Sequence, residues 1–334
     1  MHPPAMRRGL LALTCLVAFL TPAPARAASA FTCGPPRCLD VAVPYPSNLK
    51  VPDDHVRILL PARYDPTGPG YPVLFLLHGA GDTYQSWTEN TDVAALTKRY
   101  HLIVVMPDGG RNANAGWYSD WKDGSRDWES FHIDVLIPWI DSHFDTLGDG
   151  HRAVAGLSMG GFGAMSYAGR HPGLFAAAAS FSGAVDTQYV SPVSGVAFAE
   201  LNSRYGTPDQ RVWGDQTTDS QTWAAHNPTA LAPQLACTKL WIASGTGTPG
   251  GAEGDDPSNP GGYMIEQFIW QMNQSFVRAL DNAGVPHHDD FYAGGYHGWP
   301  YWQADLHWAL PGLYRAIAST RSAVPCAVAA GGPR

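Results

Sequence analysis

The fold of this chain is decided by the stretch Val154-Ala155-Gly156-Leu157-Ser158-Met159-Gly160-Gly161-Phe162-Gly163-Ala164. An apolar run precedes Gly-Leu-Ser-Met-Gly and a run of small residues follows it, which is typical of a strand, a tight turn and a helix. Glycines two positions before and after Ser158 avoid the collision that a Cβ would cause across such a turn. We therefore expect a strand at 151–155, Ser158 at the apex, and a helix over 161–170 whose N-terminal N–H groups face the serine.

Strands and helices alternate on both sides of this turn. Apolar runs predict strands at 39–43, 55–60, 71–77, 101–106, 176–181, 239–243 and 287–292. Helices are predicted at 91–99, 127–144, 263–283 and 302–318, with a Gly/Pro/Asp-rich loop at 244–262. This alternation favours an α/β fold, with a mostly parallel sheet and helices on both faces. Residues of about 186–235 are too many for a simple connection, so we expect a cap-like insertion there.

The first 30 residues are predicted to be a secretory signal peptide. Arg7 and Arg8 precede the apolar run 9–20, and small residues follow, with cleavage sites near 27 or 30. The apolar run is too short to span a bilayer stably, and no later run reaches the roughly 18 residues that a membrane helix needs. We therefore expect a secreted, single-domain protein of residues 31–334 without stable membrane insertion.

Composition and charge narrow the class of protein further. The chain has 45% hydrophobic and 15% charged residues, which is typical of a globular domain. The net charge of −8 becomes about −11 once the three arginines of the signal peptide leave, so nucleic acid is excluded as a partner. No Cys-x-x-Cys or His-rich cluster indicates a metal, and no cofactor is predicted.

Cysteine usage agrees with export. Four cysteines remain after processing, and an even count in an exported protein favours two disulfides. Although three connectivities are possible, we expect Cys33 to pair with Cys38 and Cys237 with Cys326.

His297 is the predicted base for Ser158. A serine hydroxyl is a poor nucleophile at neutral pH, so it needs a base, and the base needs an orienting acid. After a turn of this kind, the acid and then the histidine follow the serine along the chain. His297 lies in Gly-Gly-Tyr-His-Gly-Trp after the last predicted strand, where a base can reach over the sheet edge. The other histidines after Ser158 fit a helix end, a strand start, a helix interior or the insertion: His171, His226, His287, His288 and His307.

The acid is expected on the loop after the strand 239–243. Glu253 is the favoured candidate, and Asp255 and Asp256 are the alternatives on the same loop. Asp186, which follows the strand 176–181, is a further candidate. At least two of the three loop carboxylates must be ordinary solvated side chains.

Backbone N–H groups and tryptophans complete the predicted site. Met159 follows the nucleophile, and Ala80 lies in the loop after the buried strand 71–77, so their N–H groups are expected to form an oxyanion hole. Several tryptophans are expected either to line the mouth and stack on sugar or aryl rings or to pack in the core: Trp87, Trp117, Trp121, Trp299 and Trp302.

Together these residues resemble the putative-esterase branch of the α/β-hydrolases, which includes the antigen 85 mycolyltransferases, secreted feruloyl and acetyl esterases and S-formylglutathione hydrolases. The likeness runs from about Val56 to Leu313. It rests on Leu-Leu-His-Gly at 76–79, Val-Met-Pro-Asp-Gly-Gly at 105–110, Trp-Tyr-Ser-Asp-Trp at 117–121, Gly-Leu-Ser-Met-Gly-Gly at 156–161 and His-Gly-Trp-Pro-Tyr-Trp at 297–302. The resemblance implies an α/β-hydrolase fold, Ser158 as nucleophile, His297 as base, and Ala80 and Met159 as oxyanion donors.

The chain also departs from antigen 85. Those enzymes carry Asp and Arg, both trehalose contacts, where this chain has His78 and Gly81. Their acid is a Glu two residues after Gly-Thr-Pro, whereas here Gly-Gly follows the same tripeptide at 247–249 and Glu253 is the first carboxylate.

The resemblance therefore implies a secreted carboxylesterase-type serine hydrolase that acts on a small-molecule or cell-envelope ester through an acyl-enzyme. An antigen 85-like acyltransferase, which moves an acyl chain to a sugar or lipid alcohol, is the alternative. A non-catalytic binding protein is disfavoured because Ser158 and His297 are both present. The sequence indicates no particular oligomeric state.

Overall fold

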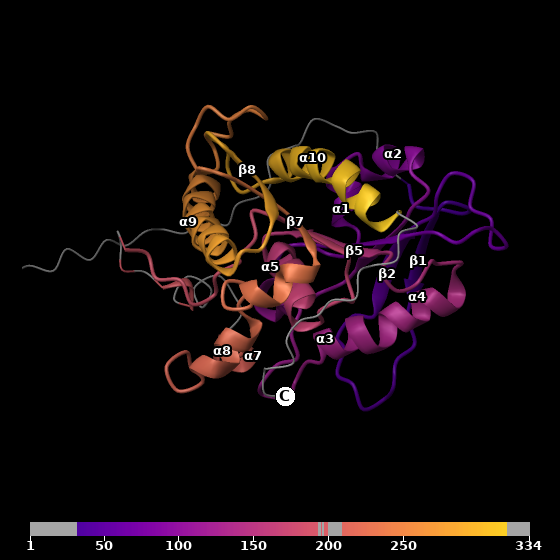
Figure 1. Ribbon diagram of the computed structural model, residues 1–334, viewed down its shortest axis with the longest axis horizontal. Helices are drawn as coiled ribbons and strands as arrows, with labels where there is room; N and C mark the ends of the chain where they lie inside the picture. The colour runs from indigo at the N-terminus through magenta and orange to yellow at the C-terminus, as the bar shows by residue number, and fades with distance from the viewer. Residues whose placement is uncertain (1–31, 193–194, 196, 200–208, 319–334) are drawn as a thin grey trace, which may run out of the picture.

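A central eight-stranded sheet organises the computed structural model, which describes residues 32–192, 195, 197–199 and 209–318 (Figure 1). Its strand order is β1-β2-β4-β3-β5-β6-β7-β8. The strands are β1 (Cys38–Ala42), β2 (His55–Leu59), β3 (Val73–Leu77), β4 (Ile103–Pro107), β5 (Arg152–Leu157), β6 (Ala177–Phe181), β7 (Lys239–Gly245) and β8 (His287–Tyr292). The β1–β2 and β2–β4 pairs are antiparallel and every other pair is parallel, so the predicted mostly parallel sheet is confirmed.

Helices cover both faces of the sheet. One face packs against α5 (Met159–Arg170), α9 (Pro260–Ala283) and a continuous helical run of α3 (Trp128–Ser130), η3 (Phe131–Leu136, π-helical) and α4 (Ile137–His143). The other face packs against α1 (Ser86–Asn90), α2 (Val93–Leu96), with its extension η1 (Thr97–Arg99), and α10 (Trp299–Ile317). Side chains of β3 alternate between the two cores, with Phe75 on the α5 side and Leu74 on the α10 side.

Three helices begin earlier than their sequence patterns predict, and one of them is α5, which begins at Met159 and not at residue 161. α9 begins at Pro260, where the Asn259 side chain caps the helix by accepting a hydrogen bond from Gly262 N–H at 2.9 Å. α10 begins at Trp299, because Pro300 is favoured in the first turn of a helix. A short helical turn, η2 (Asn112–Asn114), lies between β4 and α3.

The described part of the predicted insertion packs against the α5–α9 side of the molecule. It contains α7 (Asp209–Val212), α8 (Ser220–His226) and η4 (Ala232–Cys237), with α7 and α8 grouped at one end of the molecule (Figure 1). A buried carboxylate, Glu129 of α3, accepts hydrogen bonds from Arg170 Nε at 2.8 Å and His171 Nε2 at 2.7 Å. Burial alone would raise the pKa of Glu129, but His171 and Arg170 outweigh it and lower the pKa to about 2. His226 of α8 lies 3.9 Å from the same carboxylate, so this cluster joins the insertion to α3 and α5.

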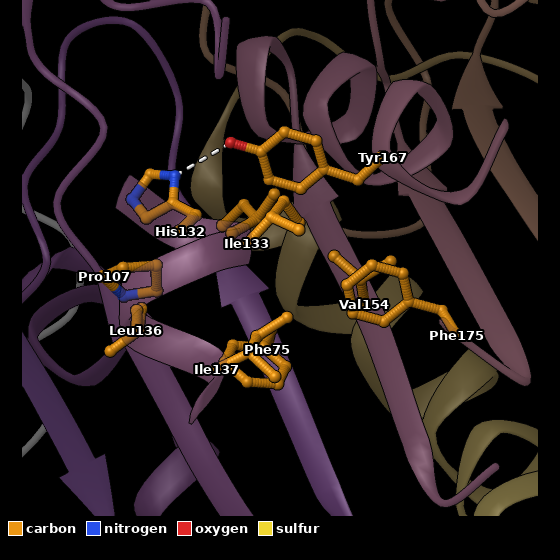
Figure 2. A pocket seen from close by; sticks show the side chains of 10 residues that line it. Phe75, Pro107, His132, Ile133, Leu136, Ile137, Val154, Tyr167 and Phe175 are labelled. Carbon is orange, nitrogen blue, oxygen red and sulfur yellow. Dashed lines mark hydrogen bonds between the residues drawn. The ribbon is translucent and has the colours of Figure 1, made fainter. Parts of the chain in front are cut away.

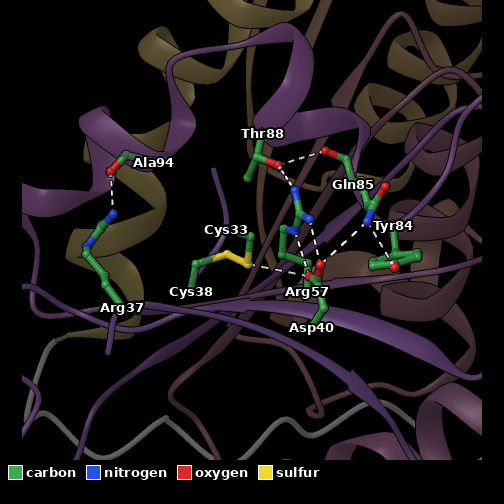
Figure 3. The surroundings of a disulfide bond; sticks show 9 residues. All are labelled: Cys33, Arg37, Cys38, Asp40, Arg57, Tyr84, Gln85, Thr88 and Ala94. Carbon is green, nitrogen blue, oxygen red and sulfur yellow. Dashed lines mark hydrogen bonds and ion pairs between the residues drawn. A yellow bond between two sulfur atoms is a disulfide. The ribbon is translucent and has the colours of Figure 1, made fainter. Parts of the chain in front are cut away.

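The predicted Cys33–Cys38 disulfide is present at the antiparallel edge of the sheet (Figure 3). Beside it, Arg57 of β2 donates two hydrogen bonds of 2.7 Å to Asp40 of β1. Arg57 also donates to Thr88 Oγ1, which ties this edge to α1. Cys326 and the predicted signal peptide lie outside the described residues, so the second disulfide and the signal peptide stay predictions.

A small void of about 10 Å³ lies in the core on the α5 side (Figure 2). Its walls are mainly apolar, and His132 on its rim is hydrogen-bonded to Tyr167 Oη at 2.8 Å and to the Asp108 carbonyl at 2.9 Å. Burial lowers the pKa of His132 to about 4. The void holds at most about one water, so it is a packing defect and not a substrate site.

Candidate active site

Ser158 lies at the apex of the turn between β5 and α5. Its backbone has φ 52° and ψ −118°, a conformation that non-glycine residues rarely adopt and that is typical of a nucleophile at this turn. The turn closes only because its glycines lack side chains. A Cβ on Gly156 would lie 2.3 Å from the Gly160 carbonyl oxygen, and one on Gly160 would lie 2.4 Å from the Leu77 oxygen.

His297 reaches Ser158 from the loop that joins β8 to α10. Its Nε2 lies 2.9 Å from Ser158 Oγ, which is hydrogen-bonding distance for a serine and its base. The His297 N–H donates to the Gly262 carbonyl at 3.1 Å, so the first turn of α9 holds the loop in place. The Trp302 ring packs edge-on against the imidazole, with 5.0 Å between ring centroids.

The carboxylate that orients His297 belongs to Glu266. Glu266 Oε2 lies 2.7 Å from His297 Nδ1 and the side chain is only 1% exposed. Its other oxygen, Oε1, accepts from Ser182 Oγ at 2.7 Å, from Gly245 N–H at 2.9 Å and from Ser244 Oγ at 3.0 Å. A carboxylate can only accept, so Nδ1 carries the imidazole proton and Nε2 is free to accept the serine proton.

The prediction that Glu253 pairs with His297 is wrong. Glu253 is exposed on the loop between β7 and α9. Asp255 and Asp256 on that loop accept hydrogen bonds from Gly250 N–H and from Ser258 instead, at 2.8 and 3.1 Å.

Asp186 is also engaged away from His297. It accepts hydrogen bonds from Asn227 Nδ2 at 3.0 Å and from Ser275 Oγ at 2.6 Å. None of the four predicted candidates therefore supplies the carboxylate that contacts His297.

A signal for Glu266 exists in the sequence of α9. Buried positions recur every three or four residues along this helix, at Gly262, Glu266, Ile269, Asn273, Phe276 and Leu280. Glu266 is the one acidic side chain in that stripe. A carboxylate on an otherwise core-facing stripe must have a strong partner, because burying it alone is costly.

The two predicted oxyanion donors lie on the elements that meet at Ser158. Met159 is the first residue of α5, and Ala80 follows β3 in the loop of residues 78–82, hereafter the oxyanion loop. A Cβ on Gly79 of this loop would lie 3.5 Å from Ser158 Cβ, so the loop runs directly beside the serine. Within the described part of the chain, neither Ala80 N–H nor Met159 N–H donates a hydrogen bond to the protein. Both donors are thus available to a ligand, although their role is still a prediction.

His78 begins the oxyanion loop and is buried. It forms a hydrogen bond of 2.8 Å from Nδ1 to the Gly79 carbonyl, and its Nε2 accepts from Gly109 N–H at 2.9 Å. Tyr118 Oη donates to the His78 carbonyl at 3.0 Å. These bonds use both ring nitrogens, so His78 supports the loop and is not free to bind a substrate.

Three of the four tryptophans predicted to bind substrate are core residues. Trp87 is 1% exposed and donates from its indole to the Leu77 carbonyl, and Trp121 is 3% exposed and donates to Gly116. Trp117 is 5% exposed and packs on the aromatic rings of Phe162 and Trp213. Their burial contradicts direct substrate contact. Of the four, only Trp299, the half-buried first residue of α10, retains an accessible side chain.

The other histidines considered for the base have structural partners. His171 contacts Glu129, and His307 contacts Asp92. His226 donates from Nδ1 to the Thr222 carbonyl, and His287 donates from Nδ1 to the Val285 carbonyl. His288 stacks on Trp241. Among the described residues, two groups have ligand atoms close enough to hold a metal ion: Asp53, Asp54 and His55, and the disulfide cysteines with Asp40. Both belong to the β1–β2 edge and not to the loops around Ser158. No helix in the described ranges is long and apolar enough to cross a membrane.

Comparison with known proteins places this arrangement in a family. Residues 52–313 match the family model described as "Putative esterase". Esterase Rv1288 of Mycobacterium tuberculosis is 37% identical over 251 residues, covering 72% of this chain and 52% of that protein. The chain thus spans about half the length of this relative.

Two further proteins are similar over more of their length. The diacylglycerol acyltransferase/mycolyltransferase Ag85B of Mycobacterium leprae is 32% identical, covering 80% of this chain and 83% of that protein. The crystal structure of MPT51 (FbpC1) from Mycobacterium tuberculosis has a TM-score of 0.63 at 22% identity, covering 84% of this chain and 98% of that one, and so has the same fold. The chain belongs to the putative-esterase family of α/β-hydrolase enzymes.

Proposed function

We propose that this protein is a serine carboxylic ester hydrolase that works through an acyl-enzyme. The observation that carries the proposal is the hydrogen-bonded series from Ser158 through His297 to Glu266, with separations of 2.9 and 2.7 Å. A serine with a positioned base and an oriented acid, beside unused backbone N–H groups, has what acyl transfer requires.

The proposed reaction has two balanced steps. Ser158 Oγ attacks the ester carbonyl carbon while its proton passes to His297 Nε2, and Glu266 stabilises the imidazolium that forms. The N–H groups of Ala80 and Met159 stabilise the oxyanion, which collapses and expels the alcohol with the proton from Nε2. Water then attacks the acyl-enzyme with His297 as base, which releases the acid and restores the serine.

Transfer of the acyl group to an alcohol is the second candidate. It is favoured by the similarity to Ag85B, which is named as an acyltransferase. Transfer to trehalose is disfavoured because the positions of the two antigen 85 trehalose contacts hold His78, which is buried and fully hydrogen-bonded, and Gly81, which has no side chain. We therefore propose hydrolysis of a small-molecule or cell-envelope ester as the main reaction.

We also propose that the protein is exported and that its mature part, residues 31–334, is one domain with the insertion at about 186–235. The predicted signal peptide supports export, as does the Cys33–Cys38 disulfide, since disulfides persist in oxidising compartments. The continuous sheet, with cores on both faces, supports a single domain.

Active-site labelling tests the proposed function. The purified wild-type protein should react with a fluorophosphonate probe, and peptide mapping should place the adduct on Ser158. Ser158→Ala should lose both labelling and cleavage of p-nitrophenyl esters. The matched control is Ser142→Ala, which removes an exposed serine of α4 and should keep both.

A panel of p-nitrophenyl esters of increasing acyl length then sizes the pocket, and added sugar or glycerol separates the two reactions. Free acid as the main product supports a hydrolase, whereas ester formed with the added alcohol supports a transferase. If wild-type protein is neither labelled nor active, or if Ser158→Ala retains ester cleavage, the proposal is wrong and a binding role becomes the better hypothesis.

A further inference from the structure

Tyr118 is a buried tyrosine that the proposed reaction does not use. Its side chain is shielded from solvent, and its hydroxyl donates a hydrogen bond of 3.0 Å to the His78 carbonyl at the start of the oxyanion loop. Burial raises the pKa of the Tyr118 hydroxyl well above its usual range, so the group keeps its proton and stays a donor. The main chain of the oxyanion loop is thus held by a bond that depends on one side chain.

The backbone at Tyr118 is strained. Trp117 and Tyr118 have φ of 52° and 45°, in the left-handed region that aromatic residues rarely adopt. Two successive residues in this region persist only where the surrounding structure holds them, and such strain clusters at functional sites. The strained pair lies beside the serine turn, because Trp117 N–H donates to Met159 Sδ at 3.4 Å. The conformation and the place of this pair therefore point to a role at the site of Ser158.

The Tyr118 ring lies directly against two glycines. A Cβ on Gly109, in the loop after β4, would lie 2.6 Å from Tyr118 Cζ, and one on Gly163 of α5 would lie 2.5 Å from Cδ2. Gly163 is four residues after Met159, so it lies about one turn along α5 from that predicted donor. The ring therefore contacts the helix that carries the Met159 N–H, while the hydroxyl contacts the loop that carries the Ala80 N–H.

The contact with Gly109 extends to the imidazole of His78. Gly109 N–H donates to His78 Nε2 at 2.9 Å, and His78 Nδ1 donates to the Gly79 carbonyl at 2.8 Å. The Gly79 carbonyl and the Ala80 N–H belong to one planar peptide group and point in opposite directions. Tyr118 thus supports His78 at both ends, at its carbonyl through Oη and at its imidazole through Gly109. The imidazole in turn helps to orient the Ala80 N–H.

We propose that Tyr118 is a positioning residue that holds the oxyanion loop in place relative to α5, through its hydroxyl on the His78 carbonyl and its ring on Gly163. The inference rests on the proposed ester-cleaving function. The two predicted donors, Ala80 N–H and Met159 N–H, must converge on one oxygen atom, which becomes negatively charged only as the reaction proceeds. Loss of the Tyr118 hydroxyl should therefore slow the reaction more than it weakens substrate binding.

Tyr118→Phe tests this role, because it removes the hydroxyl and keeps the ring. Its kcat and KM on p-nitrophenyl acetate are compared with those of the wild type, and kcat is expressed per serine labelled by the fluorophosphonate, so that unfolded protein is not counted. We expect kcat to fall about three- to tenfold with KM within about twofold. The loss is smaller than the 100- to 1,000-fold or so that removal of an oxyanion donor costs, because both donors remain and only their support is weakened.

Binding of a boronic acid gives a second readout. Benzeneboronic acid forms a tetrahedral adduct with a nucleophilic serine and so resembles the transition state more than the substrate does. Its inhibition constant should rise in Tyr118→Phe by about the same factor as kcat falls. Gly163→Ala keeps the hydroxyl but places a Cβ 2.5 Å from the Tyr118 ring, so it should also lower kcat per labelled serine with KM little changed.

Tyr71→Phe is the matched control. Tyr71 is also buried, and its hydroxyl also donates to a main-chain carbonyl, that of Arg63 at 3.3 Å. Because Tyr71 precedes β3 and His78 follows it, the two hydroxyls contact the chain near opposite ends of one strand. Tyr71→Phe should therefore keep the wild-type kcat, KM and inhibition constant.

Three results would overturn the inference. One is a Tyr118→Phe variant whose kcat per labelled serine and inhibition constant both stay within twofold of wild type. Another is a change confined to KM, and the third is an equal loss of kcat in Tyr71→Phe. Failure of the proposed function is distinguishable, because wild-type protein would then not be labelled at Ser158 by the fluorophosphonate, whatever the Tyr118 variants do.

Discussion

Replacement of Glu266 by glutamine is the most informative single change in this protein. Glutamine has nearly the same shape as glutamate, but one of its two terminal groups donates instead of accepting. In the wild type, Oε2 accepts from His297 Nδ1 at 2.7 Å, and Oε1 accepts from three donors, including Ser182 Oγ and Gly245 N–H. Every orientation of the amide therefore sets an N–H₂ group against a donor.

The least disruptive outcome for the variant inactivates the base. If the amide oxygen keeps the three donors at Oε1, the amide N–H₂ faces His297, and the imidazole satisfies it by carrying its proton on Nε2. Nε2 then cannot accept the Ser158 proton. Loss of the correct tautomer and of the charge that stabilises the imidazolium lowers kcat by about 10,000-fold in a well-studied serine protease, so we expect about 1,000- to 10,000-fold here. That corresponds to about 4–5.5 kcal/mol of transition-state stabilisation.

Steady-state hydrolysis of p-nitrophenyl acetate measures the loss, and Glu253→Gln is the matched control. Glu253 is the exposed carboxylate that its place in the sequence favours as the acid, and its replacement should leave kcat/KM within about twofold. The reasoning is refuted if Glu253→Gln is the damaging variant, or if Glu266→Gln folds with a wild-type Tm and keeps more than about a tenth of wild-type kcat/KM.

Three other predictions concern the fold. Gly156→Ala would place a Cβ 2.3 Å from the Gly160 oxygen, so we expect little folded protein by circular dichroism and gel filtration, while Gly34→Ala, which meets nothing within 4 Å, should behave as wild type. Replacement of both Cys33 and Cys38 by serine removes the disulfide and opens a loop with a sequence separation of 5. We expect this double variant to lose about 2 kcal/mol of unfolding free energy and about 4 °C in Tm, with kcat unchanged. A wild-type Tm of the double variant under non-reducing conditions would contradict this prediction. Burial, aided by Arg170, lowers the pKa of His226 to about 4, below its unfolded value of about 6.5. The folded protein therefore favours the neutral ring, and its full stability is present above about pH 6.5. The free energy of unfolding falls as the pH drops from about 6.5 toward 4, by at most about 1.4 kcal/mol per pH unit. Urea titrations across this range should show a shallower loss in His226→Gln than in wild type or in the exposed control His307→Gln, and equal slopes would refute the assignment.

Most of the sheet could be predicted from sequence because its strands are buried on both faces. Strands such as β3 and β4 are continuous apolar runs, and β5 ends in a tight turn in which a side chain at Gly156 or Gly160 would clash. Helix ends were predicted less well, because Asn259 and Pro300 begin helices outside the apolar pattern. Short α1 was not predicted, since a five-residue helix carries no periodic signal.

The site residues that follow strand ends could also be predicted from sequence, and the others could not. Ser158 and His297 meet as expected because both follow strand ends at one edge of the sheet, and the topology brings those ends together. Chain order and loop position predict the acid on the loop after β7, whereas Glu266 reaches His297 from the second turn of α9. The prediction that Trp87, Trp117 and Trp121 contact substrate is wrong for a different reason. Sequence spacing does not distinguish an aromatic ring in the core from one at the mouth of a site.

The location of Glu266 on α9 has a consequence for how this enzyme can change. The segment 246–259, which lies between β7 and α9, contributes no side chain to the Ser158–His297–Glu266 series. Exposed positions inside the segment, such as Ala252 and Glu253, can therefore change while Ser158, His297 and Glu266 keep their places. The two ends of the segment should be kept, because Thr246 Oγ1 accepts a hydrogen bond from Gly294 N–H at 2.8 Å and Asn259 caps α9. Directed evolution of substrate preference should begin with this segment, with Asp255 kept because it fastens Gly250 and Tyr263.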